Sequence, residues 1–121
     1  MKIILILVTL VLIMSGCQSQ EDYLTWSQVR QMIEDEVDFR LIDVREAHEF
    51  AQGRIDGAVL IPLGQLSERA EVELPDIDAK IVVYCRSGRR SAEAAKILED
   101  MGYTDVHDLG GINSWPYEIV D

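Results

Sequence analysis

A short polar segment around Cys85 holds the residues whose types and spacing could do chemistry. It consists, in chain order, of Cys85, Arg86, Ser87, Gly88, Arg89, Arg90 and Ser91. Gly88 allows the backbone to turn back on itself, so that several N–H groups can point inward. A helix that begins near Ser91 would add the positive end of its dipole. Together with the three arginines, these features favour a negative group at the centre, and the group there is the Cys85 sulfur.

Such surroundings convert a cysteine into a nucleophile. A free thiol has a pKa of about 8.5, and helix N-termini or neighbouring cations lower that pKa to about 3.5–7.5. We therefore expect Cys85 to be a thiolate at neutral pH, as a nucleophile requires. The alternative is an inert cysteine at the end of a core strand, which the adjacent glycine and arginines disfavour. No histidine base is then needed, and the isolated His48 and His107 have no metal-ligand spacing, so we expect neither a metal nor another cofactor.

The elements on either side of this segment are the clearest in the chain. Residues 80–84 form a continuous β-rich run, as expected of a strand with both faces buried. Residues 91–101 carry apolar side chains at helical spacing and are followed by Gly102, which favours a helix that ends there. Cys85 would then lie beyond the carboxyl end of a strand, which is where open α/β sheets bind ligands.

The rest of the chain repeats the alternation of strand and helix. Thr25 and Gln28 have the spacing of a capping box and predict a helix start. Further strands are predicted at 39–44, 58–61 and 105–107, and further helices at 46–51 and 63–70. The alternation indicates an α/β fold with a parallel sheet.

The N-terminus has the pattern of an export signal. Twelve of the first 16 residues are apolar, and this run is shorter than the roughly 20 residues that span a bilayer. The residues Met14, Ser15, Gly16 and Cys17 resemble a bacterial lipobox, in which the cysteine is lipidated. We therefore predict a lipoprotein-type signal peptide at 1–16, a tether at 17–22 and a domain at 23–121. The protein would be exported and anchored by lipid to a bacterial membrane, on the periplasmic or extracellular face.

The state of Cys85 depends on Cys17, the only other cysteine. In an oxidising compartment the two could form a disulfide. A lipidated Cys17 has its sulfur in a thioether, which would leave Cys85 unpaired. An unpaired cysteine in an exported protein indicates reactive chemistry.

Length and charge narrow the class of protein further. A chain of 121 residues allows one domain, and its formal net charge is −11. Without Lys2, which lies in the predicted leader, the body has 10 basic and 22 acidic residues, a net charge of −12. Such a surface repels phosphates and anionic lipid head groups, which excludes nucleic acid as an expected partner. The membrane contact expected is through the lipid alone.

Four pieces of the sequence, in this order, resemble the rhodanese family of sulfurtransferases. They read LIDVRE at 41–46, GRIDGAVLIP at 53–62, CRSGRRS at 85–91, and GYTDV at 102–106 followed by LGGINSW at 109–115. The resemblance implies a rhodanese-like fold: a parallel five-stranded sheet flanked by helices on both faces. It also implies that Cys85 carries sulfane sulfur as a persulfide. The donor would be thiosulfate or a related compound, and the acceptor cyanide in assays or a thiol in cells, a protein thiol included.

The same resemblance suggests roles for the charged residues. Arg86 and Arg89 could attract the oxyanion of the donor, and Arg90 either faces the anion or holds the loop through an acid. Asp43 and Arg45 match the family's Asp-Val-Arg signature, which suggests a supporting ion pair at a strand end.

Three alternatives remain beside the enzyme. A persulfide carrier would accept sulfur from a partner and show little turnover on thiosulfate. A redox protein would form a mixed disulfide, although the chain has no resolving cysteine. A cysteine phosphatase or arsenate reductase would place five residues between cysteine and arginine, whereas Arg90 leaves four. The smaller cradle favours sulfur over a tetrahedral phosphate.

Overall fold

The structure, a computed structural model, describes residues 23–121. The predicted signal peptide, the tether and Cys17 lie outside the described residues. Within the described part, no helix has the length and the apolar character needed to cross a membrane.

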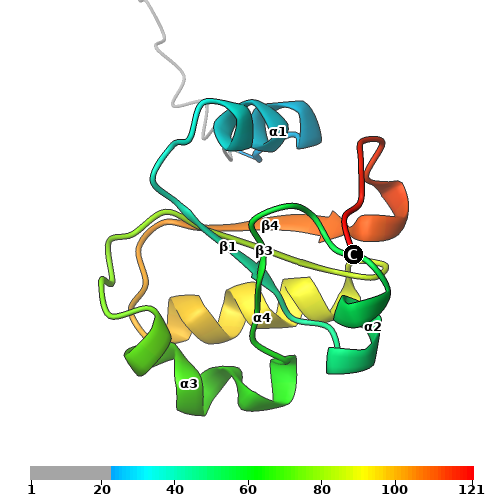
Figure 1. Cartoon of the computed structure of the whole chain (residues 1–121). Coiled ribbons are helices and arrows are strands. Elements are labelled where there is room, and N and C mark those ends of the chain that lie inside the picture. The colour runs from blue at the N-terminus through cyan, green and yellow to red at the C-terminus, as the bar shows by residue number, and fades with distance from the viewer. Residues whose placement is uncertain (1–22) are drawn as a thin grey trace, which may run out of the picture.

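A parallel sheet forms the centre of the molecule (Figure 1). Its strands, in the spatial order β2, β1, β3, β4, are β2 (Val59–Leu60), β1 (Arg40–Asp43), β3 (Ile81–Cys85) and β4 (Val106–Gly111). Each neighbouring pair runs parallel, because a helix lies on each connection between strands. All four strands predicted from the residues are therefore confirmed.

The expectation of a fifth strand was wrong. Within residues 23–121 the sheet has four strands, and the one further pairing is an isolated antiparallel bridge between Arg54 and Val120. This bridge is held by two hydrogen bonds of 2.8 Å. It does not extend into a strand because the next residue, Ile55, is buried in the core and donates its N–H to the hydroxyl of Tyr84.

The helices follow the predicted pattern closely. They are α1 (Trp26–Glu34), α2 (Ala47–Gln52), α3 (Leu66–Glu73) and α4 (Arg89–Asp100), with short 3₁₀ turns η1 (Leu63–Gln65) and η2 (Ile112–Ser114). The capping box at the start of α1 is confirmed. Gln28 donates its N–H to the Thr25 hydroxyl, and the Gln28 side chain accepts the Thr25 N–H.

Helices cover both faces of the sheet, as the family resemblance implies. Figure 1 shows α1 above the sheet and α3 with α4 below it. Along β3 the side chains alternate between the two faces. Ile81, Val83 and Cys85 join the core shared with α3 and α4, while Val82 and Tyr84 join the core beneath α1. Cys85 thus lies at the carboxyl end of the central strand, on the side of α4.

Candidate active site

The loop after β3 wraps around the Cys85 sulfur. Gly88 has φ +106°, a left-handed conformation that favours glycine, and it donates its N–H to the sulfur at 3.0 Å. Gly88 is also the N-cap of α4, so that helix begins at Arg89 rather than near Ser91. The arginines at 89 and 90 therefore belong to the first turn of the helix, and the loop itself spans only residues 86–88.

The sulfur is enclosed and surrounded by donors. Cys85 is 1% exposed, and burial by itself raises the pKa of its thiol. The contact with the Ser91 hydroxyl, whose oxygen lies 3.6 Å from the sulfur and accepts from the thiol, and hydrogen bonds from the N–H groups of Ser91, Gly88 and Ser87 outweigh that effect. The pKa of Cys85 is therefore lowered from its ordinary value, because these donors stabilise the thiolate more than burial destabilises it.

Replacing Ser91 by alanine is expected to raise the pKa of Cys85, because the largest stabilising contact of the thiolate is lost while its burial remains. The measurement is the pH dependence of thiolate absorbance or of alkylation rate. Ser87→Ala is the matched control, since Ser87 acts through its backbone N–H, which alanine retains. An unchanged titration in Ser91→Ala would show that the backbone alone ionises the sulfur.

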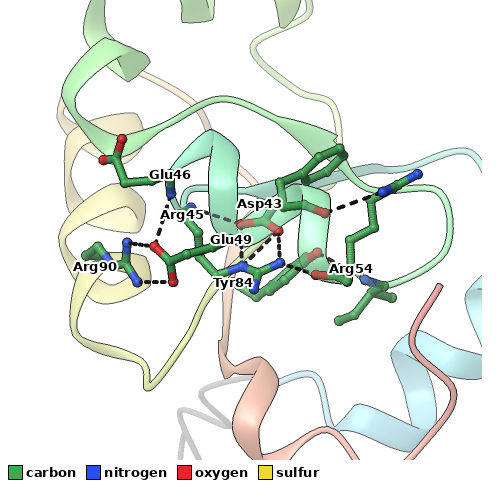
Figure 2. A network of polar contacts seen from close by, with 10 residues as sticks. Asp43, Arg45, Glu46, Glu49, Arg54, Tyr84 and Arg90 are labelled. Atoms are coloured by element: carbon green, nitrogen blue, oxygen red, sulfur yellow. Dashed lines mark hydrogen bonds and ion pairs between the residues drawn. The ribbon is translucent and has the colours of Figure 1, made fainter. Parts of the chain in front are cut away.

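The three arginines of the segment have different environments. Arg86 and Arg89 are exposed and form no ion pair within residues 23–121. Arg90 instead binds Glu49 of α2 with two hydrogen bonds, of 2.7 and 3.0 Å. Figure 2 shows the two side chains facing each other across the gap between α2 and α4. Of the two roles considered for Arg90, the structure therefore has the pairing with an acid, which joins the first turn of α4 to α2.

Glu49 is a site residue that the sequence analysis did not single out. It also accepts the N–H of Glu46 and so caps α2. The hydrogen bond from Arg90 lowers the pKa of Glu49 to about 2, against an ordinary 4.5. Because the first turn of α4 carries two arginines next to a positive helix end, the Glu49 carboxylate offsets an unfavourable charge there. The ion pair joins residues 41 positions apart, which no local pattern reveals.

Glu49→Gln is expected to lower the free energy of unfolding by about 2 kcal/mol at pH 7. This lies between the losses that follow from breaking an exposed ion pair and a buried one. The folded-state pKa lies below the unfolded one, so the pair's contribution is complete above about pH 4.5 and is lost as the pH falls toward 2. Denaturant unfolding of both proteins at pH 7 and pH 3 tests this. The exposed Glu93→Gln is the control, and a pH-independent difference would contradict the prediction.

Asp43 and Arg45 form a buried ion pair at the end of β1. The Nε and Nη2 atoms of Arg45 lie 2.7–3.0 Å from the Asp43 carboxylate. The same Nη2 atom donates to the carbonyl of Gly53 at 2.6 Å. The pair therefore ties β1 to the end of α2, the helix that carries Glu49 (Figure 2).

The end of β4 supplies a second support for the loop. The pairing of β3 with β4 is shifted after Val83, which makes Leu109 an extra residue, a β-bulge. The bulge brings Gly111 against the loop, where a Cβ atom would lie 2.5 Å from the carbonyl oxygen of Arg86. Asn113, just beyond, donates its N–H to that same oxygen at 3.1 Å. The sequence analysis did not predict this contact; the signal that could have indicated it is the pair of consecutive glycines at 110–111.

A pocket of about 300 Å³ opens beside the loop, with Arg86 and Arg45 in its lining. Another, of about 330 Å³, lies away from Cys85 along α4 and β4. Only the first adjoins the residues that could do chemistry. Among residues 23–121 there is no group of three or more His, Cys, Asp or Glu side chains that could hold a metal ion.

Comparisons with known proteins place the chain in a family. A family model described as "Rhodanese-like domain" matches residues 25–117. That range includes β1 with its Asp43–Arg45 pair, the Cys85 loop and the β4 bulge.

Individual relatives are similar over most of the domain. "Thiosulfate sulfurtransferase PspE" of Escherichia coli is 42% identical over 71 residues, which cover 59% of this chain and 68% of that protein. "Putative sulfurtransferase YtwF" of Bacillus subtilis is 39% identical over 90 residues, 74% of this chain and 85% of that protein. A solved structure, "rhodanese with anions from E. coli", has a TM-score of 0.64 and 38% identity, covering 68% of this chain and 96% of that one.

Proposed function

The chain belongs to the rhodanese-like domain family, and from that premise we propose that it is a thiosulfate sulfurtransferase that works through a persulfide on Cys85. The observation that carries the proposal is the state of the sulfur. It lies at the carboxyl end of β3, with a lowered pKa and with hydrogen bonds from the N–H groups of Gly88 and Ser91. A thiolate held by amides is the nucleophile that sulfur transfer requires.

In the first half-reaction the Cys85 thiolate attacks the outer sulfur of thiosulfate, or of a related donor. A bond forms between the two sulfurs, the bond inside the donor breaks, and sulfite leaves with its electron pair. Arg86 and Arg89, which have no ion pair within the described residues, are available to attract the oxyanion. The N–H groups that stabilise the thiolate stabilise the anionic persulfide in the same place.

In the second half-reaction a thiophilic acceptor attacks the outer sulfur of the persulfide. Cyanide would become thiocyanate, and a thiolate would become a persulfide. The sulfur–sulfur bond of the persulfide breaks, and the Cys85 thiolate leaves with the electron pair. The thiolate is then available for the next catalytic cycle. No metal, cofactor or external oxidant is needed for this balance.

The Arg90–Glu49 pair argues against phosphatase or arsenate reductase chemistry. Those enzymes need an arginine that faces the bound oxyanion from the end of the loop. In this protein the arginine at that end already binds a carboxylate in two hydrogen bonds. The short loop of residues 86–88 likewise leaves less room for a tetrahedral ion.

The test is the mass of the Cys85 peptide before and after thiosulfate, combined with turnover in the thiosulfate:cyanide assay. The proposal expects the addition of one sulfur atom, removal of that sulfur by cyanide, and release of thiocyanate over many cycles. A sulfur adduct that cyanide does not turn over would instead identify a persulfide carrier. No adduct at all would overturn the proposal.

We also propose that residues 1–16 direct export and that Cys17 carries the lipid, so that the domain acts on the outer side of a bacterial membrane. The support is the apolar run and the lipobox-like residues before Cys17. Metabolic labelling with a fatty acid tests this, since the label should be lost in Cys17→Ser.

A further inference from the structure

The pocket beside the Cys85 loop is larger and more varied than a simple anion needs. It lies among α2, the loop, η2 and the C-terminal segment. The side chains that the argument uses are Arg45, Gln52, Arg86, Ile112, Asn113 and Ile119. They combine two cations, two carboxamides and two aliphatic groups in one cavity.

Arg45 has one nitrogen left for a ligand. Its Nε and Nη2 atoms are occupied by Asp43 and by the Gly53 carbonyl, whereas Nη1 makes no hydrogen bond within residues 23–121. The side chain is only 7% exposed. In the described part no fully enclosed side-chain nitrogen or oxygen lacks a partner, so Nη1 is accessible from outside, on a side chain that lines this pocket. A charged donor held rigidly in that way is suited to an anion.

The pocket has an excess of positive charge in an acidic molecule. Arg86 lines it, is exposed and forms no ion pair among the described residues. The one acid in the lining, Glu49, is paired with Arg90, just as Arg45 is paired with Asp43, so the excess positive charge of the lining is that of Arg86. The chain as a whole is strongly acidic. The pocket therefore differs in the sign of its charge from the rest of the protein.

The size and the aliphatic wall indicate an organic ligand. A volume of about 300 Å³ lies at the lower end of pockets that hold small organic molecules. Thiosulfate has no apolar part, yet Ile112 lines this cavity and Ile119, 45% exposed, lies at its edge. Gln52 and Asn113 add groups that both donate and accept hydrogen bonds.

We propose that this pocket binds the acceptor, a small organic thiol with a carboxylate at the other end of a short aliphatic chain. Arg45 Nη1 and Arg86 bind the carboxylate, and the chain packs against the isoleucines. This rests on the proposed function, because it requires the Cys85 persulfide. The acceptor's thiolate attacks the outer sulfur, a new sulfur–sulfur bond forms, and the Cys85 thiolate departs with the electron pair of the broken bond.

A single-turnover experiment tests the proposal with two matched thiols. The Cys85 persulfide is formed with thiosulfate, freed of donor, and mixed with 3-mercaptopropionate or with 3-mercaptopropionamide. Each rate is divided by that thiol's rate with a small persulfide in solution, which removes differences in thiol reactivity. We expect the carboxylate to react about tenfold faster, the difference between a charged and a neutral hydrogen bond. Net charge alone predicts the opposite order.

Two variants test whether the preference for the carboxylate thiol arises in this pocket. Gln52→Glu places a negative charge in the pocket and is expected to abolish the preference for the carboxylate. Gln65→Glu adds the same charge on η1, outside the lining, and is expected to retain it. A persulfide that reacts equally with both thiols, or a preference that survives Gln52→Glu, overturns the inference alone. Failure to form any persulfide overturns the proposed function and this inference with it.

Discussion

Cys85→Ser is expected to reduce thiosulfate:cyanide transfer by about 10⁴-fold or more, the scale of losses seen when a nucleophile is removed. A serine hydroxyl is not ionised by the donors that hold the thiolate, and it cannot carry a sulfur as a persulfide. The variant should fold, because serine is smaller than cysteine and Ser91 remains beside it to accept or donate a hydrogen bond. Turnover and the mass of the protein after thiosulfate are the two measurements.

Cys17→Ser is the matched control for this variant. It removes the only other cysteine of the chain and is expected to lose the lipid label while it retains sulfur transfer in the assay. If Cys85→Ser still formed thiocyanate, or if the added sulfur were found on Cys17, the persulfide mechanism would be wrong.

Gly111→Ala is expected to lower sulfur transfer by about 100-fold, since misplacing a catalytic group by about 1 Å can cost that much. The new Cβ atom would lie 2.5 Å from the Arg86 carbonyl oxygen and 2.8 Å from the Ser87 Cα atom. Both are backbone atoms, so the loop that holds the Cys85 sulfur has to move. The pKa of Cys85 should rise in the same variant, because its N–H donors are displaced.

Gly64→Ala is the control for the change from glycine to alanine. A Cβ atom at Gly64, in η1, has no neighbour within 4 Å, so we expect activity and thiol titration to be unchanged. Unfolding by denaturant shows how much of the Gly111→Ala effect is loss of fold. Normal activity in Gly111→Ala would mean that the loop adapts and that its contact with β4 does not position the sulfur.

The supports of the loop come from three directions. Glu49 holds it through Arg90 on the side of α2, Gly111 and Asn113 hold it on the side of β4, and the Asp43–Arg45 pair fixes the end of α2. Cys85 itself ends β3, so the sulfur is positioned by the strand and the N–H donors around it by these supports. This arrangement explains how the residues around Cys85 keep its sulfur enclosed with a lowered pKa.

The elements of the fold were predictable because each depends on nearby residues. The continuous run before Cys85 predicted β3, the spacing of Ala94, Ile97, Leu98 and Met101 predicted α4, and Thr25 with Gln28 predicted the start of α1. The Cys85 segment itself was also visible in the sequence, since its glycine and arginines are consecutive. Only the helix boundary differed, because Gly88 ends the loop two residues earlier than expected.

By itself the sequence determined the alternation of strands and helices. It also determined that Cys85 lies between the strand and the helix with the clearest sequence patterns. The tertiary structure alone decided that Arg90 is paired while Arg86 and Arg89 form no ion pair among the described residues, that the sheet has four strands there, and that Arg45 keeps a nitrogen for a ligand. The reason is physical: periodicity and capping are set within a few residues. The partners Glu49 with Arg90, or Gly111 with the Arg86 carbonyl, meet only when distant segments pack.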